Sequence, residues 1–293
     1  MSFAMAMSSI SASMFEKIYV QITTACFLRC HFCPSGALNA RHSHMPLDFF
    51  ESVCKQAREQ TRLLALHLLG DPLCVANLGD YLDCVHAHGL HVELTTAGLH
   101  TERLPSLTHP ALRQLNFSLT SFAGNGGASV ASLRDYLAPI IAICKQKPKS
   151  LFINLRFWDK ENALFSHILA ILSEHFTMAL DSGRKNREGR IRLCERVFLC
   201  SDSLFVWPSL HNPIVQHSGT CYGLRSHIGI LTDGRVVPCC LDYAGALCLG
   251  SLQHSTLGLI LQSPRAQAIK GGFVQGRLVE ELCQRCGYIQ RFA

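Results

Sequence analysis

Three cysteines stand close together near the start of the chain, at Cys26, Cys30 and Cys33. Their thiolates are soft ligands, which suit zinc or iron–sulfur clusters. A closed structural metal site needs four protein ligands, and this group has no obvious fourth ligand beside it. Three thiolates on a four-iron cluster would leave one iron free to hold a small molecule.

A second group of cysteines lies in the last quarter of the chain. Cys221 precedes, and Cys239 follows, a segment in which the Asp-Gly dipeptide at 233–234 predicts a tight β-hairpin turn. Such a hairpin would bring the two cysteines together. A C-x2-C pair nearer the end of the chain is formed by Cys283 and Cys286. Four thiols from a hairpin and a helix end would complete a cluster site, with zinc as the alternative metal.

Apolar segments that are typical of buried strands alternate with amphipathic segments that are typical of helices. The expected strands are Ile18–Thr23, Leu63–Leu69, His91–Thr96, Leu112–Leu119, Leu151–Phe157 and Leu204–Val206. The expected helices cover about Asp48–Gln60, Val75–His88, Ser129–Cys144 and Ala163–Phe176. This alternation predicts an α/β fold with a parallel sheet that is curved or partly closed into a barrel. Functional groups should then lie beyond the carboxyl ends of the strands.

The composition limits the kinds of partner and the cellular compartment that are expected for this protein. The 293 residues carry 27 Lys and Arg against 21 Asp and Glu, a modest net charge of +6 that fits an anionic substrate. No basic tract points to nucleic acid, and no apolar run is long enough to cross a membrane. The clustered spacing of the 15 cysteines favours metal binding in a reducing cytoplasm over disulfides. Residues 1–15 are expected to form a loose arm rather than an export signal.

The C-x3-C-x2-C spacing of the first group, with Phe32 before its last cysteine, resembles the signature of the radical S-adenosylmethionine (SAM) superfamily. The resemblance implies a partial (β/α)6 TIM-like barrel over residues 16–210. It also implies a 4Fe-4S cluster on Cys26, Cys30 and Cys33 whose open iron binds SAM. Reductive cleavage of SAM would give a 5′-deoxyadenosyl radical that abstracts hydrogen from a substrate, with a flavodoxin- or ferredoxin-type protein as reductant.

The same resemblance implies a SAM pocket at the strand ends. Leu69-Gly70-Asp71-Pro72 is similar to the Gly-Gly-Glu-Pro turn of the family, although Leu replaces the first Gly and Asp replaces Glu. The further pocket positions that the resemblance implies are Thr96 after the third strand, Ser118 on the fourth and Arg156 on the fifth. Arg156 could hold the methionine carboxylate of SAM through two hydrogen bonds.

The C-terminal cysteines resemble the SPASM/twitch extensions of radical SAM enzymes, with Gly234 to Cys239 as the G-x4-C element. The run of cysteines that a full SPASM domain carries between Cys240 and Cys283 is missing. A shorter twitch type is therefore expected over residues 211–293, with one auxiliary 4Fe-4S cluster. Its ligands would be Cys221, Cys239, Cys283 and Cys286. Cys240 could replace Cys239 or face the substrate.

The resemblance leads to an expected activity of peptide or protein modification, or of small-molecule dehydrogenation. The auxiliary cluster would serve electron transfer or substrate contact. Two alternatives remain from the residues alone. One is a radical SAM enzyme that acts on RNA or a nucleotide precursor, and the other is a non-enzymatic zinc or iron–sulfur scaffold. Neither a membrane nor a nucleic acid is an expected partner.

Overall fold

A computed structural model describes residues 15–37, 42–125, 129–180 and 190–292. The expected N-terminal arm, residues 1–15, lies outside this part of the chain except for its last residue. Within the described ranges no helix is both long enough and apolar enough to cross a membrane.

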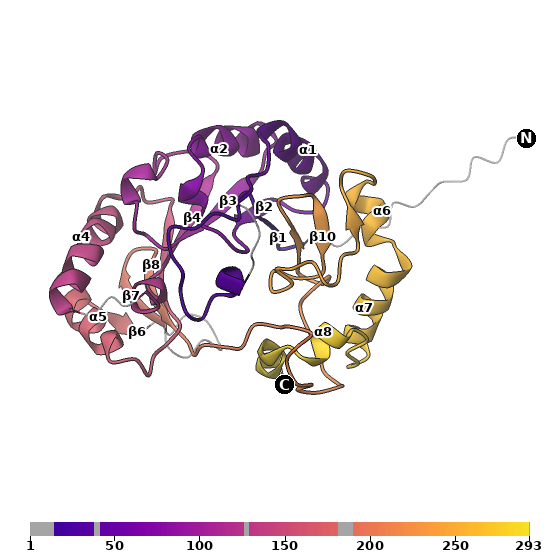
Figure 1. Cartoon of the computed structure of the whole chain (residues 1–293). Helices are drawn as coiled ribbons and strands as arrows, with labels where there is room; N and C mark the ends of the chain where they lie inside the picture. Colours follow the sequence, from indigo (N-terminus) through magenta and orange to yellow (C-terminus); the bar gives the residue numbers. More distant parts are fainter. Residues whose placement is uncertain (1–14, 38–41, 126–128, 181–189, 293) are drawn as a thin grey trace, which may run out of the picture.

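The described chain is organised on one curved sheet (Figure 1). Its strands run in the order β11-β10-β9-β1-β2-β3-β4-β5-β8-β7-β6. The neighbours from β9 through β1 to β5 and β8 pair in parallel. The strands of the barrel are β1 (Lys17–Val20), β2 (Leu63–Leu66), β3 (His91–Thr96), β4 (Leu112–Ser118), β5 (Phe152–Phe157) and β8 (Val197–Ser201). The predicted α/β fold with a partial barrel is confirmed.

Helices cover the outer, convex face of this sheet (Figure 1). They are α1 (Leu47–Ala57), α2 (Leu78–Ala87), α4 (Val130–Gln146) and α5 (Leu164–Ser173), and a single turn, α3 (Thr120–Ala123), follows β4. Each long helix turns one apolar stripe toward the strands, as Phe50, Val53, Cys54 and Ala57 do on α1. The outer face of the sheet is therefore the hydrophobic core, and the inner face is left for polar side chains.

The expected strand at Leu204–Val206 is wrong. The sixth parallel strand of the barrel is β8, and it is joined through an antiparallel edge to β7 (Arg190–Cys194) and β6 (Ala179–Leu180). Val197 is fully buried against the core, whereas Val206 is 67% exposed. Both segments are short and apolar, and only packing distinguishes a buried strand from an exposed apolar loop.

The C-terminal segment extends the same sheet. The predicted hairpin is confirmed as β9 (His227–Ile230) and β10 (Arg235–Val237), and β9 pairs in parallel with β1. The hairpin turn uses Gly234 at a φ of +83°, which glycine adopts without strain. Beyond it lie β11 (Gly250–Ser251), α6 (Leu257–Leu261), α7 (Pro264–Val274) and α8 (Glu281–Gln284). The start of the chain and its last quarter thus meet along one pair of strands.

Candidate functional site

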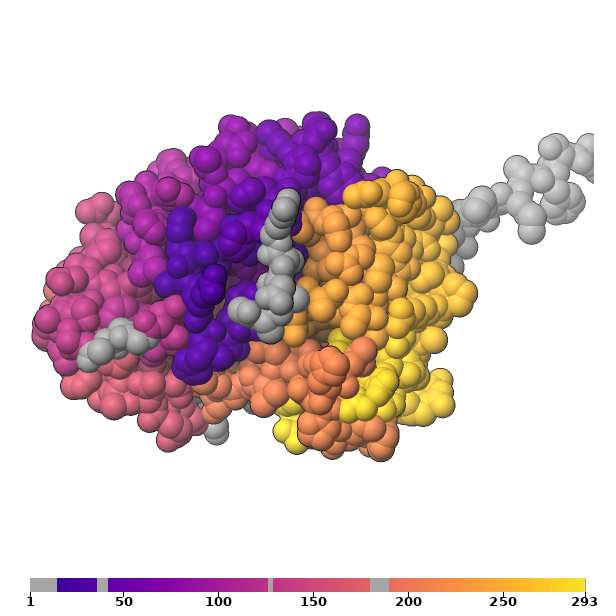
Figure 2. Space-filling view, in the orientation of Figure 1, coloured from indigo at the N-terminus to yellow at the C-terminus, as the bar shows by residue number. Residues whose placement is uncertain are grey.

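A cavity of about 1830 Å³ lies inside the curve of the sheet. Its lining comes from the barrel strands, both at their carboxyl ends and at their starts (Lys17, Arg113 and Phe152), from the cysteine loop after β1 and from the C-terminal segment. In Figure 2 the indigo N-terminal segment lies between the magenta half of the barrel and the orange and yellow C-terminal segment. Every predicted site residue lines this cavity: Cys26, Cys30, Phe32, Cys33, Gly70, Asp71, Thr96, Ser118, Arg156, Cys221, Cys239, Cys283 and Cys286.

The N-terminal cysteine loop is held in place by the chain that follows β4. Asn125 accepts a hydrogen bond from Arg29 N at 2.9 Å, and its amide donates to Cys30 Sγ at 2.8 Å. A Cβ added to Gly124 would lie only 2.5 Å from the ring of Phe32. Sequence reasoning missed both residues, because a run of Gly and Asn indicates only a turn until the fold places it against the cysteines.

Two thiols of this loop have raised pKa values, so a positively charged partner would favour their thiolate form. Burial raises the pKa of Cys26 to about 12 and also raises the pKa of Cys30, although the Asn125 amide opposes the second shift. A thiolate here therefore needs a cation to form at neutral pH. All three cysteines are free thiols in the described structure. This donor set fits a metal or an iron–sulfur cluster.

The turn after β2 packs directly on the cysteine loop. Gly70 has a φ of +81°, and a Cβ there would lie 2.3 Å from the carbonyl oxygen of Thr23. Asp71 N donates to Ala25 O at 2.7 Å. The turn can therefore approach the loop only because residue 70 has no side chain.

The carboxylate of Asp71 joins the ends of two strands. Its Oδ1 accepts from Leu73 N at 3.0 Å, and its Oδ2 accepts from Thr96 Oγ1 and Ala97 N, both at 2.9 Å. Burial raises the pKa of this carboxyl group, and the three hydrogen bonds oppose the shift. Asp71 and Thr96 thus line the cavity together, with much of their hydrogen-bonding capacity used in holding its wall.

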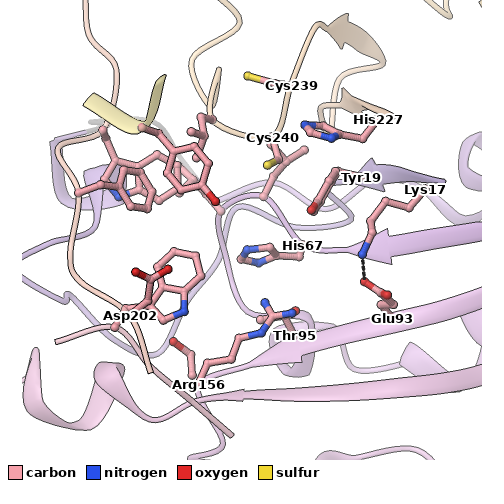
Figure 3. A pocket seen from close by; sticks show the side chains of 18 of the residues that line it. Lys17, Tyr19, His67, Glu93, Thr95, Arg156, Asp202, His227, Cys239 and Cys240 are labelled. Atoms are coloured by element: carbon pink, nitrogen blue, oxygen red, sulfur yellow. Dashed lines mark hydrogen bonds and ion pairs between the residues drawn. The ribbon is translucent and has the colours of Figure 1, made fainter. Parts of the chain in front are cut away.

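Ser118 and Arg156 lie side by side on β4 and β5. Their Cα atoms are partners in the parallel register, and both side chains line the cavity. Ser118 Oγ accepts a hydrogen bond from Ser121 Oγ at 3.2 Å. Arg156 extends toward His67 and Thr95 (Figure 3).

The four C-terminal thiols come from three separate segments. Cys221 precedes β9, Cys239 follows β10, Cys283 lies in α8, and Cys286 follows it. Burial raises the pKa of Cys239 well above its usual value, and the nearby thiols of Cys240, Cys221, Cys283 and Cys286 raise it further. Burial likewise raises the pKa of Cys286 to about 11. The fold therefore gathers these partly exposed thiols into one group at the cavity wall.

Neither group of thiols has the geometry of a site for one metal ion. Among the described residues, no three His, Cys, Asp or Glu side chains converge closely enough to hold a single ion. Ligands to a four-iron cluster each bind a different iron, so they need not converge on one point.

Cys240 occupies a different place from Cys239. Its thiol lies beside the hydroxyl of Tyr19 on β1 and lines the cavity (Figure 3). Burial raises the pKa of Cys240 to about 12. Cys240 lines the cavity, as Cys239 does, so both uses that the sequence left open for it stay predictions.

Comparison with known proteins defines the class of this fold. The structure of BtrN in complex with AdoMet and 2-DOIA has a TM-score of 0.60 at 15% sequence identity, over 94% of this chain and 93% of that one. Streptococcus suis SuiB bound to the precursor peptide SuiA has a TM-score of 0.56 at 12% identity, over 95% and 73% of the two chains. The structure of anSMEcpe with bound AdoMet and a peptide has a TM-score of 0.59 at 11% identity, over 94% and 87%. These are radical SAM enzymes with SPASM or twitch domains.

The C-terminal segment is matched at the level of sequence. Residues 221–287 match the family model of SPASM, described as an iron–sulfur cluster-binding domain. The match begins at the first predicted ligand, Cys221, and ends one residue after the last, Cys286. The search of curated proteins found no matching relative. The fold of the whole chain and the identity of its C-terminal domain thus confirm the predicted resemblance to radical SAM enzymes with an auxiliary-cluster domain.

Proposed function

We propose that this protein is a radical SAM enzyme that modifies a peptide or dehydrogenates a small molecule. The observation that carries the proposal is that the three thiols of the N-terminal loop and the four C-terminal thiols face one cavity. A 4Fe-4S cluster on the N-terminal thiols would supply the electron that cleaves SAM to methionine and a 5′-deoxyadenosyl radical. BtrN in complex with 2-DOIA and SuiB bound to a precursor peptide support the two substrate classes.

The residues of the chain have distinct roles in this proposal. Cys26, Cys30 and Cys33 hold the SAM-binding cluster, and Phe32 packs the loop against Gly124. The SAM side of the cavity is bordered by Gly70, Asp71, Thr96 and Ser118. Residues 16–210 form the catalytic core in this assignment, and residues 211–293 form the auxiliary domain.

The auxiliary domain would hold a second 4Fe-4S cluster on Cys221, Cys239, Cys283 and Cys286. These thiols share the cavity wall with the barrel, so a second cluster bound there would lie within reach of a substrate or of its electrons. A flavodoxin- or ferredoxin-type protein in the cytoplasm would provide the reducing electron.

The proposal is tested by anaerobic reconstitution followed by reduction with dithionite in the presence of SAM. We expect about eight irons per chain, because two four-iron clusters are bound, and formation of 5′-deoxyadenosine. Cys30→Ala should abolish SAM cleavage, whereas Cys194→Ala, which removes a thiol from β7 outside the cavity lining, should not. Stoichiometric zinc without SAM cleavage would instead support a scaffold, and salt-sensitive tRNA binding would support an RNA-modifying enzyme.

A further inference from the structure

The guanidinium of Arg156 lies in the cavity and has no ionic partner among the residues that the structure describes. Lys17, by comparison, pairs with Glu93 at 2.5 Å, and Arg291 pairs with Asp202 at 2.6 Å. The side chain of Arg156 forms no hydrogen bond and no ion pair with any residue that the structure describes, and it is only partly exposed. Since a half-buried cation without a partner is costly, this position favours an anionic ligand.

The groups that face Arg156 leave its charge uncompensated. Burial, together with the charges of Arg156 and Lys17, lowers the pKa of His67 to about 3, so this imidazole is neutral at pH 7. Burial likewise lowers the pKa of His227 to about 4. Tyr19, between the two histidines, has its pKa raised well above the usual value by burial and is also neutral. These three neighbours therefore add no negative charge that could offset the charge of Arg156.

Aromatic side chains form the wall beside Arg156. We call them the aromatic wall: Trp158, Phe205, Trp207, Tyr288 and Phe292. Phe205 is at its centre, with ring centroids 5.8 Å from Trp158, 5.4 Å from Trp207 and 5.0 Å from Tyr288. All five rings are only partly exposed and line the cavity. Such a wall can hold a flat apolar group by ring contacts.

Arg156 also stands between the two groups of thiols. On one side it adjoins Ser118, which leads to the N-terminal cysteine loop through Ser121 and Asn125. On the other side its charge acts on Tyr19, which lies beside Cys240 (Figure 3). A molecule held by Arg156 would therefore lie between the two proposed clusters.

We propose that Arg156 binds the carboxylate of the substrate and that the aromatic wall binds an aromatic group of the same molecule. This inference rests on the proposed function and names the substrate class of that site. The carboxylate could belong to a free aromatic acid or to the C-terminal residue of a peptide, because both present the same group to the guanidinium. In this proposal Arg156 binds the substrate. The sequence pattern had instead suggested that Arg156 binds the carboxylate of SAM.

The test is calorimetric titration of the reconstituted, SAM-saturated protein under anaerobic conditions. The probes are N-acetyl-L-phenylalanine, its neutral carboxamide, N-acetyl-L-alanine, and a hexapeptide that ends in phenylalanine. We expect the first probe to bind at least about tenfold more tightly than the carboxamide or the alanine derivative, since each lacks one of the two contacts. Tighter binding of the hexapeptide would assign the carboxylate to a peptide, and tighter binding of the free acid would assign it to a small molecule.

Two variants separate the substrate role from a general effect of charge. Arg156→Gln should weaken the binding of N-acetyl-L-phenylalanine by at least about tenfold. Its affinity for SAM should stay within about twofold of the wild-type value. Arg113→Gln removes another cation that lines the cavity, from an exposed position near the start of β4, and should change neither affinity.

Two results would overturn the inference. One is that Arg156→Gln loses affinity for SAM but binds N-acetyl-L-phenylalanine as the wild type does. Arg156 would then bind the SAM carboxylate, and the proposed function would still hold. The other is a wild-type protein that binds SAM but does not prefer the aromatic carboxylate. A wild-type protein that does not bind SAM at all would contradict the proposed function itself.

Discussion

The two groups of cysteines are built in opposite ways. The N-terminal thiols belong to one loop of eight residues, and its three cysteines are all partly exposed to the cavity. The C-terminal thiols come from the segment before β9, the end of the hairpin and a short helix, and all four are likewise only partly exposed. A local loop with three ligands would leave a coordination position open on a cluster, whereas a group of four would close it.

The difference extends to the hydrogen bonds that the thiols accept. Cys30 receives a hydrogen bond from the side chain of Asn125, and Cys33 contacts the hydroxyl of Ser35 at 3.2 Å. Cys221 receives one from a backbone group, Gly223 N at 3.5 Å, as Cys26 does from Leu28 N at 3.5 Å, but no side-chain donor to the four C-terminal thiols is found among the described residues. The N-terminal site can thus be adjusted by side-chain substitutions, whereas the C-terminal site depends on the backbone of the hairpin.

The largest effect should come from the adjacent pair in the C-terminal group. Cys239→Ala is expected to lose about four irons per chain, because a ligand of the auxiliary cluster is removed, while SAM cleavage by the N-terminal site persists. Cys240→Ala should keep about eight irons, since its thiol faces Tyr19 and the cavity. Iron analysis after reconstitution distinguishes the two. Equal iron loss in both variants would make Cys240 a ligand and weaken the distinction between the groups.

Glycine substitutions compare how tightly the two sites are packed. Gly70→Ala should destabilise the protein by about 3 kcal/mol. It places a Cβ on a residue whose φ is already left-handed, and this Cβ would clash with Thr23 O. Gly223→Ala should cost less, about 1–2 kcal/mol, since φ is ordinary and the nearest contact, Pro238 O, is at 2.9 Å. Gly89→Ala, with a left-handed φ but open space around it, is the control. Unfolding in urea measures all three, and a Gly70 variant as stable as the Gly89 variant would contradict the close contact.

Low pH should destabilise the protein through His67, which lines the cavity. Because the pKa of His67 is lowered to about 3, the unfolded chain binds the proton more readily, and stability is lost as pH falls from about 6.5 toward 3. Between pH 7 and pH 5 this loss is about 2 kcal/mol. His67→Gln should lose about 2 kcal/mol less over that range. His91→Gln removes an exposed imidazole and should behave as the wild type; equal slopes in all three proteins would refute the assignment.

The smallest effect concerns the hydrogen bond to Cys30. Asn125→Ala should lower the midpoint potential of the N-terminal cluster by on the order of tens of millivolts, because a bond of about 1 kcal/mol to the sulfur is lost. The C-terminal cluster should keep its potential. Redox titration followed by electron paramagnetic resonance resolves the two signals. A shift in both signals, or in neither, would show that the two sites are not tuned separately.

The sequence by itself determined the class of the fold and the thiols. Alternation of apolar and amphipathic segments is a local property, and it predicted five of the six barrel strands near their observed positions. The spacing of Cys26, Cys30 and Cys33 is also local, since eight residues of one loop carry the whole proposed ligand set. The hairpin at 233–234 made the C-terminal group predictable as well, because a tight turn fixes which residues meet.

Only the tertiary structure decided which residues surround those thiols. The sixth barrel strand could not be distinguished from the exposed segment at 204–206, because both are short and apolar. Asn125 lies 95 positions from Cys30, and Tyr19 lies more than 200 positions from Cys240, so no local pattern links them. The surroundings of Arg156 also depend on the tertiary structure. An arginine on a strand predicts a partner, but which groups face it is fixed by the curvature of the sheet and by the C-terminal segment that closes the cavity.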